Sequence, residues 1–302
     1  MIDITGLNVR FGESYAVEGF DLSVPDGRTT MIIGQSGSGK SVMLSAILRI
    51  LPREARVSGS VILGGRELLG MKEREFRKIR GVELSYIPQG SGNSLNPLLK
   101  TGFQIAEPIM EHHKIKKQPA LERAIALMRR LNIGDEERVA GSFPHTLSGG
   151  MKQRALIAMG VAAEAPVILA DEPTKGLDRA RIAIVEELFA QLRGSTILCV
   201  SHDLRFAAKT ADRICVMYEA QKVEEADAAE FFARPLHPYS KMLLDALPEN
   251  GMRVSAGFTR AAEKNEGCRF YASCPSRTDR CTEAVPVTAT GTRKVRCVLY
   301  AD

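Results

Sequence analysis

The chain has 302 residues, of which 44% are hydrophobic and 25% are charged, and its formal net charge is +5. These values are ordinary for a globular protein, and the length favours one large domain with an appendage. The basic residues form no dense stripe, which argues against a nucleic-acid-binding protein. No apolar run approaches the roughly 18 residues of a membrane span, and the N-terminus lacks the features of a secretory signal. We therefore expect a chain that starts in the cytosol and does not enter a bilayer by itself.

The opening part of the chain is predicted to form short strands separated by turns. Apolar residues favour strands at 2–9, 16–24 and 28–33, and the last of these runs directly into Gly34. From 41 to 51 the apolar residues have helical spacing, which a proline ends. A strand, a glycine-rich loop and a helix therefore follow one another.

The middle of the chain has a different pattern. Between 103 and 139 no strand signal interrupts the sequence, and 119–131 places its apolar residues on one face of a helix. We therefore expect a helical insert over about 90–150.

Strand signals return in the later part of the chain. Continuous apolar runs lie at 167–170, 196–200 and 214–217, which is typical of buried parallel strands. After residue 248 the sequence becomes polar and then rich in cysteine. We therefore predict two domains, a nucleotide-binding domain at 1–247 and a C-terminal extension at 248–302.

The segment after the third predicted strand fits the phosphate-binding pattern G-x-x-x-x-G-K-[ST] completely. Its glycines let backbone amides turn inward around phosphates, Lys40 places a charge at the β- and γ-phosphates, and the Ser41 hydroxyl ligates Mg²⁺. The N-terminus of the following helix adds a favourable field for an anion. A glycine-rich turn without function is the alternative, and the order of strand, motif and helix argues against it. The sequence therefore predicts that ATP and Mg²⁺ are bound by Gly34, Gln35, Ser36, Gly37, Ser38, Gly39, Lys40 and Ser41.

Two acidic residues follow the apolar run at 167–170. Asp171 at the strand end suits a second anchor for Mg²⁺, and Glu172 is placed to polarise the water that attacks the γ-phosphate. Such a pair would otherwise be read as ordinary surface acids. The phosphate-binding loop on the same chain favours the catalytic interpretation.

A doubled glycine after Ser148 forms a second anion-binding corner. The segment Leu147-Ser148-Gly149-Gly150-Met151-Lys152-Gln153 precedes a predicted helix at 155–163, and helix N-termini attract anions. This segment closely resembles the signature motif of the ATP-binding-cassette ATPases, in which it faces a nucleotide. The resemblance implies an α/β fold with a P-loop NTPase core of mostly parallel sheet, an antiparallel β-subdomain and a helical subdomain. In this chain a small cysteine-rich C-terminal tail follows.

Further cassette elements are identified by the same resemblance, in the expected order. Phe11 resembles the aromatic residue that stacks on adenine. Gln89 resembles the Q-loop glutamine, which touches Mg²⁺ and the attacking water, and His202 resembles the switch histidine at the γ-phosphate. Asp178 resembles the D-loop aspartate. The preceding Lys175-Gly176 departs from the usual Ser-Ala, which puts the coupling across the dimer in doubt.

Three segments resemble the oligopeptide, dipeptide and nickel importer group, namely 94–108, 234–244 and the cysteine tail. The resemblance covers nearly the whole chain and implies the D-type ATP-binding subunit of such an importer. It also implies a second, different ATPase chain, two integral membrane permease subunits and an extracytoplasmic solute-binding protein. The location would then be peripheral, on the cytoplasmic side of the cell membrane. The cargo, peptide or nickel, is not encoded in this chain.

The tail contains the pattern C-x5-C-P-x5-C-x15-C, formed by Cys268, Cys274, Cys281 and Cys297. Four thiols in a small cytosolic segment with little core favour a bound metal. Four-cysteine ligation with a Cys-Pro step suits an iron–sulfur cluster such as [4Fe-4S], which the family resemblance also implies for some members. Zinc and unligated thiols remain as alternatives, although the spacing is unlike that of zinc fingers. The other two cysteines, Cys199 and Cys215, stand in apolar runs and are expected in the core.

Two further functions compete with an importer subunit. A cassette ATPase that acts on nucleic acid or ribosomes would carry tandem cassettes, a coiled-coil insert or a basic stripe, and the sequence has none of these. Alternatively, the cysteine tail would sense metal or redox state and regulate the ATPase.

Overall fold

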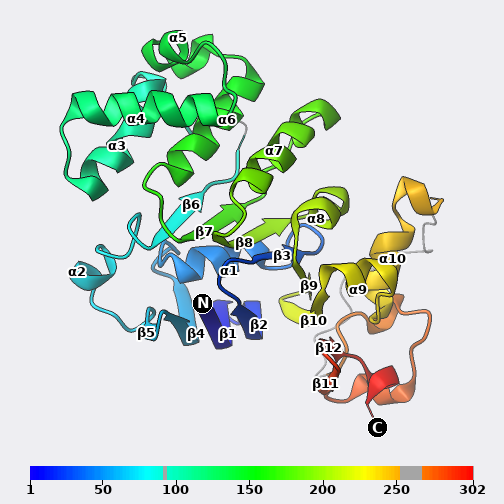
Figure 1. Ribbon diagram of the computed structural model, residues 1–302. Coiled ribbons are helices and arrows are strands. Elements are labelled where there is room, and N and C mark those ends of the chain that lie inside the picture. Colours follow the sequence, from blue (N-terminus) through cyan, green and yellow to red (C-terminus); the bar gives the residue numbers. More distant parts are fainter. Residues whose placement is uncertain (91–93, 252–266, 302) are drawn as a thin grey trace. The chain divides into compact units, whose positions relative to one another are not determined.

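The structure is a computed structural model that describes residues 1–90, 94–251 and 267–301 (Figure 1). The chain divides into two compact units, which are described separately. Unit 1 contains Met1, 24–29 and 63–201, and unit 2 contains 2–23, 30–62 and the chain from 202 onward.

The sheet of unit 1 consists of parallel strands in the order β6 (Leu84–Ile87), β7 (Val167–Asp171) and β8 (Thr196–Ser201). Every residue of β7 and β8 is buried, as expected for parallel strands that are covered on both faces. Ile87 pairs with Ala170, and Asp171 pairs with Val200. The carboxyl ends of the three strands therefore meet at one edge, where the predicted acidic pair lies.

The stretch predicted to be a helical insert, about 90–150, lies in unit 1 and contains helices where the structure describes it. Between residues 94 and 150 the structure has helices and no strand, and these helices pack on one another (Figure 1). The amphipathic helix expected at 119–131 is α4 (Lys117–Arg130), which buries Ala120, Ala124 and Met128. The other helices of unit 1 are α2 (Glu73–Phe76), α3 (Thr101–His113), α5 (Glu136–Gly141), α6 (Gly149–Val161) and α7 (Arg179–Gln191). The short pieces are β5 (Arg66–Glu67) and the 3₁₀ turn η1 (Pro144–Thr146).

Unit 2 begins with a hairpin of β1 (Ile2–Phe11) and β2 (Ser14–Val24), and β1 also neighbours β4 (Ala55–Leu63). A two-residue connection joins β1 to β2, and Gly12 within it has φ +57°, which favours glycine. These strands form the antiparallel β-subdomain. Buried positions alternate with less buried ones along most of β1, so one face of the sheet packs on the core.

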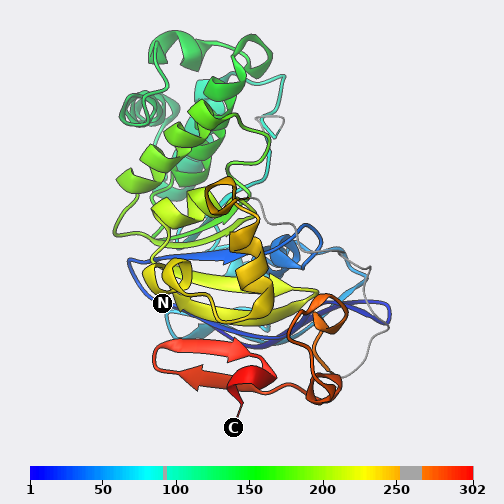
Figure 2. The same ribbon diagram turned by 90° about the vertical axis from the view of Figure 1, so that its right-hand side faces the viewer.

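The second sheet of unit 2 joins strands from distant parts of the chain. β3 (Thr29–Ile33) pairs in parallel with β9 (Arg213–Tyr218), and β9 pairs antiparallel with β10 (Gln221–Asp227). β10 also pairs antiparallel with β12 (Arg293–Arg296). β12 forms a hairpin with β11 (Val287–Thr290), which is drawn in red in Figure 2. The cysteine-rich tail therefore extends this sheet by two strands.

The helices of unit 2 are α1 (Lys40–Ile47), α8 (Leu204–Thr210), α9 (Ala228–Ala233) and α10 (Pro238–Asp245). Short 3₁₀ turns complete it, namely η2 (Pro248–Asn250), η3 (Tyr271–Ser273), η4 (Asp279–Thr282) and η5 (Val298–Tyr300). The predicted domain boundary at 247/248 lies between α10 and η2 and stays a prediction. The polar stretch expected directly after it falls largely on 252–266, outside the described residues.

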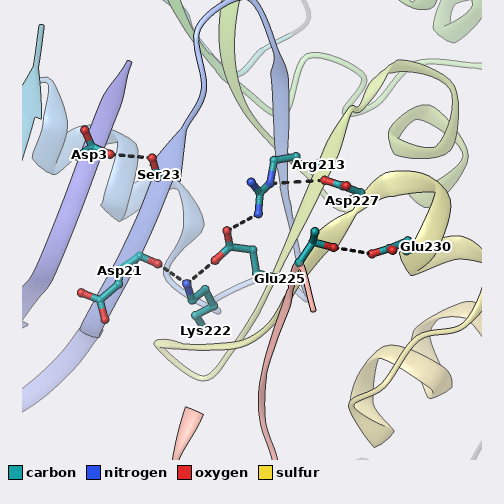
Figure 3. Close-up of polar contacts among 9 residues, drawn as sticks. Asp3, Asp21, Ser23, Arg213, Lys222, Glu225, Asp227 and Glu230 are labelled. Carbon is teal, nitrogen blue, oxygen red and sulfur yellow. Dashed lines mark hydrogen bonds and ion pairs between the residues drawn. The ribbon is translucent and has the colours of Figure 1, made fainter. Parts of the chain in front are cut away.

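Buried charges connect the strands of unit 2 (Figure 3). The Glu225 carboxylate accepts a hydrogen bond from Arg213 at 2.8 Å and one from Lys222 at 2.6 Å. The Lys222 ammonium also donates to the backbone carbonyl of Asp21 on β2. Because Lys222 and Glu225 are buried, each requires the other to offset the loss of hydration.

Candidate active site

The predicted phosphate-binding loop connects β3 to α1 in unit 2, and its backbone requires glycine at two positions. Gly34 has φ +153° and Gly39 has φ +100°. A Cβ at Gly34 would lie 2.1 Å from the Met217 carbonyl oxygen, and one at Gly39 would lie 2.0 Å from the Ala16 carbonyl oxygen. The loop is thus packed against neighbouring backbone, and no other residue fits at these positions.

Lys40 is the first residue of α1, and its side chain folds back over the loop. The ammonium donates to the Gly34 carbonyl at 2.7 Å and to the Gln35 carbonyl at 2.8 Å. Lys40 and Ser38 are buried, whereas Ser36 and Gly37 are exposed at the tip and Ser41 is half-buried in the first turn. A positive charge at a helix N-terminus and a glycine-rich loop together form a cradle suited to phosphate groups.

Two further predicted site residues belong to unit 2. Phe11 ends β1, and 36% of it is exposed, so its ring is accessible for stacking. His202 directly follows β8 and is exposed. The adjacent Asp203 caps α8, because its carboxylate accepts hydrogen bonds from the Arg205 and Phe206 amides at 2.9 and 3.1 Å. This cap fixes the backbone next to the histidine.

The acidic pair lies at the end of β7 in unit 1, and both residues are buried. Glu172 has φ +48°, a conformation that residues with a side chain seldom adopt. Its amide donates to the Val200 carbonyl at 2.9 Å, which holds this turn against β8. Such backbone strain occurs preferentially at functional sites.

Asp171 receives a hydrogen bond from the β6 strand. The Tyr86 hydroxyl donates to its carboxylate at 3.4 Å, and burial together with the Asp171 charge raises the pKa of Tyr86. Gln89 follows β6 and is exposed, and the Ser94 hydroxyl donates to its backbone carbonyl at 3.4 Å. Since β6 and β7 are parallel neighbours, Gln89 follows the same edge of the sheet as Asp171 and Glu172.

The signature segment forms the start of α6 in unit 1. Ser148 is its N-cap, and its hydroxyl oxygen accepts from the Met151 amide at 3.3 Å. A Cβ at Gly149 would lie 3.2 Å from the Arg181 guanidinium, so the doubled glycine lets the arginine of α7 approach. The Gln153 side chain donates to the Pro173 carbonyl at 2.8 Å. The signature helix is therefore tied to the turn that follows Glu172.

Asp178 caps α7 by accepting from the Arg181 amide at 3.0 Å, and its carboxylate also pairs with the Arg181 guanidinium at 3.3 Å. Gly176, which departs from the usual alanine, has φ +74°. Glycine suits this backbone conformation better than alanine does. The glycine in the unusual D-loop sequence therefore suits the backbone conformation of the turn in which it lies.

The cysteines of the tail are reduced and gathered in unit 2. Cys274, Cys281 and Cys297 are buried and Cys268 is half-buried, and the Cys268 amide donates to the Cys281 carbonyl at 2.8 Å. Burial raises the pKa of Cys268 to about 11, and the other three thiols contribute to the increase. Among the residues that the structure describes, no group of three or more His, Cys, Asp or Glu side chains is arranged to hold a metal.

The remaining cysteines are core residues, as predicted. Cys199 and Cys215 are fully buried in β8 and β9, and burial raises the pKa of both thiols.

A lysine-bearing phosphate cradle between a buried strand and a helix, on a chain that also has an acidic pair at a strand end, defines a P-loop nucleotide hydrolase. Residues 17–175 match the ABC transporter family, and residues 223–281 match the oligopeptide/dipeptide transporter C-terminal region. The chain therefore belongs to the ATP-binding-cassette transporter family, and it is an ATPase of that family.

Curated relatives match over most of their length. A probable peptide ABC transporter ATP-binding protein of Sinorhizobium fredii is 36% identical, over 95% of this chain and 90% of the relative. The oligopeptide transport ATP-binding protein AppD of Bacillus subtilis is also 36% identical, over 95% and 92%. The dipeptide transport ATP-binding protein DppD of Lactococcus lactis is 38% identical, over 82% and 74%.

Among solved structures, the chain is similar to the ATP-binding cassette MJ0796 in a dimeric post-hydrolysis state bound to ADP and phosphate. The TM-score is 0.68 at 27% identity, and the match covers 76% of this chain and 99% of the cassette. In the described residues of the present chain, no helix combines the length and apolarity that crossing a bilayer requires.

Proposed function

We propose that this chain is the ATP-hydrolysing, energy-coupling subunit of an importer for dipeptides or oligopeptides. The match of residues 223–281 to the oligopeptide/dipeptide transporter C-terminal region carries this proposal, because that region lies beyond the matched cassette. The names of the relatives, which refer to peptide, oligopeptide and dipeptide transport, support the same cargo.

The proposed catalytic roles are those that the motifs predict, and the positions of the side chains within each unit support them. The loop at 34–41 binds the phosphates. The Lys40 ammonium, which contacts the loop carbonyls, neutralises the charge of the β- and γ-phosphates. Ser41, Gln89 and Asp171 offer oxygen ligands, which Mg²⁺ prefers. Glu172 polarises the attacking water, His202 contacts the γ-phosphate, and Phe11 stacks on adenine. Asp178 couples the two ATPases.

Each nucleotide is held between the phosphate-binding loop of one ATPase and the signature residues of another, so hydrolysis requires pairing. Ser148, Gly149 and Gly150 serve the nucleotide of the partner, which is a second, different ATPase chain. The dimeric cassette with ADP and phosphate supports pairing of this kind. The pair sits at the cytoplasmic side of the membrane on two permease subunits, which receive cargo from an extracytoplasmic solute-binding protein.

Co-purification and uptake test this proposal. Affinity purification of the full chain from detergent-solubilised membranes should recover two integral membrane proteins and a second ATPase. Cells should take up a labelled dipeptide at a rate that falls to background in the Lys40→Ala variant, while labelled Ni²⁺ uptake stays unchanged. If nickel uptake depends on Lys40 and dipeptide uptake does not, the cargo is nickel and the peptide assignment is wrong. Purification with ribosomes and without membrane proteins would overturn the importer function.

We also propose that the four tail cysteines bind a metal cofactor, an iron–sulfur cluster in preference to zinc. The donor set supports this assignment, because four free thiols lie in one small segment, and burial, with a contribution from the charges of Cys274 and Cys281, raises the pKa of Cys268 and of Cys297. Binding would require these thiols to rearrange, since the described residues are not arranged around a metal. When bound, the group would link Cys268, Cys274, Cys281 and Cys297 and stabilise a segment with a small core.

Metal analysis after anaerobic purification tests the cofactor. We expect about four iron and four sulfide per chain from the Cys₄ ligand set, with a visible absorption band that the Cys274→Ser variant loses. The matched control is Cys215→Ser, which removes a buried thiol outside the tail and should keep the band. Stoichiometric zinc would assign the alternative metal, and metal-free protein with normal ATPase activity would refute binding.

A further inference from the structure

A tyrosine from the C-terminal part of the chain reaches the phosphate-binding loop. Tyr239 lies on α10, is fully buried, and accepts a hydrogen bond through its hydroxyl oxygen from the Gln35 amide at 3.0 Å. Burial raises the pKa of Tyr239 to about 12, so the hydroxyl is neutral at physiological pH. The two residues are 204 positions apart in the sequence.

The bonded amide belongs to the peptide group that also orients the lysine. The nitrogen of the Gly34–Gln35 peptide contacts Tyr239, and the carbonyl oxygen of the same peptide accepts from the Lys40 ammonium at 2.7 Å. A rotation of this peptide would break both bonds together. Tyr239 therefore fixes the orientation of a carbonyl that positions Lys40.

The tyrosine is itself held by the C-terminal region. Its ring packs on Tyr218 at a centroid distance of 4.5 Å and on Phe270 at 5.5 Å, and its amide donates to His237 Nδ1 at 3.1 Å. Phe270 is fully buried and lies between Cys268 and Cys274 in the tail. A continuous aromatic contact thus leads from the cysteine segment to the loop.

The start of α10 is anchored as well. The buried Glu224 carboxylate accepts hydrogen bonds from the Leu236 and His237 amides, each at 2.8 Å, and from Arg293 of β12 at 2.8 Å. Bonds of this kind to a buried carboxylate are strong. The backbone that presents Tyr239 is therefore well fixed.

We propose that Tyr239 is a positioning residue for ATP binding, which holds the Gly34–Gln35 peptide and through it Lys40, and that Phe270 supports it from the cysteine segment. This inference rests on the proposed phosphate-binding role of the loop at 34–41. If Tyr239 positions Lys40, the C-terminal region supports the nucleotide site and also adds strands to the sheet.

The Tyr239→Phe variant tests the hydrogen bond without removing the ring. A net bond of typical strength changes affinity by about three- to tenfold. We expect the KM for ATP of the assembled transporter to rise by that factor, with kcat changed less than twofold. The reason is that the lost interaction stabilises bound ATP and the transition state equally. The dissociation constant of a fluorescent ATP analogue for the full chain should rise in parallel, while the melting temperature stays nearly constant.

Two further variants separate the outcomes. Tyr218→Phe removes a hydroxyl from the same aromatic cluster and should leave KM unchanged. Phe270→Leu should raise KM in the same direction as Tyr239→Phe, with binding of the analogue as the readout if transport complexes form poorly. Wild-type KM in both Tyr239→Phe and Phe270→Leu would overturn the positioning role.

Lys40→Ala distinguishes this inference from the proposed function. If Lys40→Ala abolishes binding of the analogue while Tyr239→Phe has no effect, only the positioning role fails. If Lys40→Ala also binds with wild-type affinity, the assignment of the loop itself fails.

Discussion

Glu172 and the loop glycines show how single residues define the site. Glu172 is buried with a positive φ, and the bond from its amide to Val200 holds it in that conformation. Gly34 and Gly39 meet carbonyl oxygens that leave no room for a Cβ. These residues were predicted from motif spacing, because that spacing encodes local backbone geometry. Tyr239 was not predicted, since nothing in the sequence around position 239 indicates a bond to Gln35.

His237 is a residue whose protonation is coupled to folding. It is buried, its Nδ1 accepts from the Tyr239 amide, and burial, with a contribution from the charge of Lys241, lowers its pKa to about 3. The buried Glu224 carboxylate also lies near, bonded to the His237 amide. The folded protein therefore keeps His237 neutral at pH values where the unfolded chain binds a proton.

The stability of the fold should consequently decrease in mildly acidic solution. The pKa of His237 is lower in the folded state, so its contribution is complete above about pH 6.5 and is lost as pH falls from there toward 3. Between pH 7.5 and 5.5 the loss is roughly 1 kcal/mol. Urea unfolding at the two pH values measures it. The His237→Asn variant keeps an acceptor for the Tyr239 amide and should lose this part of the pH dependence, and an unchanged dependence would contradict the assignment.

At the scale of elements, the predicted strands and helices with apolar patterns were found with small shifts of their ends. The strand expected at 2–9 is β1 (Ile2–Phe11), and the helix expected at 41–51 is α1 (Lys40–Ile47). The helix ends early because Arg49 has φ +55°, a left-handed conformation. The order of motifs therefore predicted the scaffold of the site well.

β10 was missed because three of its buried positions are charged. Lys222, Glu224 and Glu225 point into the protein where a strand pattern would require apolar residues. Glu224 and Glu225 have partners on other elements, Arg293 on β12 and Arg213 on β9. Lys222 pairs with Glu225 within β10. β12 was missed for the same reason, since one buried valine, Val295, stands among basic residues. Pairing between distant segments cannot be inferred from a local pattern.

The charged contacts of β10 predict a contrast between two carboxylates that both pair with Arg213 (Figure 3). In Glu225→Ala the buried Lys222 loses its counter-charge, which should lower the free energy of unfolding by about 3–5 kcal/mol. In Asp227→Asn an exposed pair at 3.9 Å is lost, and the change should stay below about 0.5 kcal/mol. Urea unfolding compares the variants, and equal effects would show that burial does not determine the value of these pairs.

At the scale of the molecule, the residues with proposed catalytic and binding roles are distributed over two compact units. Unit 1 carries Gln89, the signature residues, the acidic pair and Asp178, and unit 2 carries the loop at 34–41, Phe11, His202 and the cysteines. The cysteine tail adds two strands and an aromatic contact to unit 2.

ATP-driven uptake in proteoliposomes tests the central claim most directly. The vesicles would contain the two permeases, this chain and its partner ATPase, with binding protein and a labelled peptide on one side and ATP on the other. Wild-type vesicles should accumulate peptide only with ATP. Glu172→Gln should retain ATP binding while hydrolysis by its own site falls by about 10²–10⁴-fold, the usual contribution of a positioned base, and uptake should fall with it. Peptide uptake at the wild-type rate with Glu172→Gln would contradict the account.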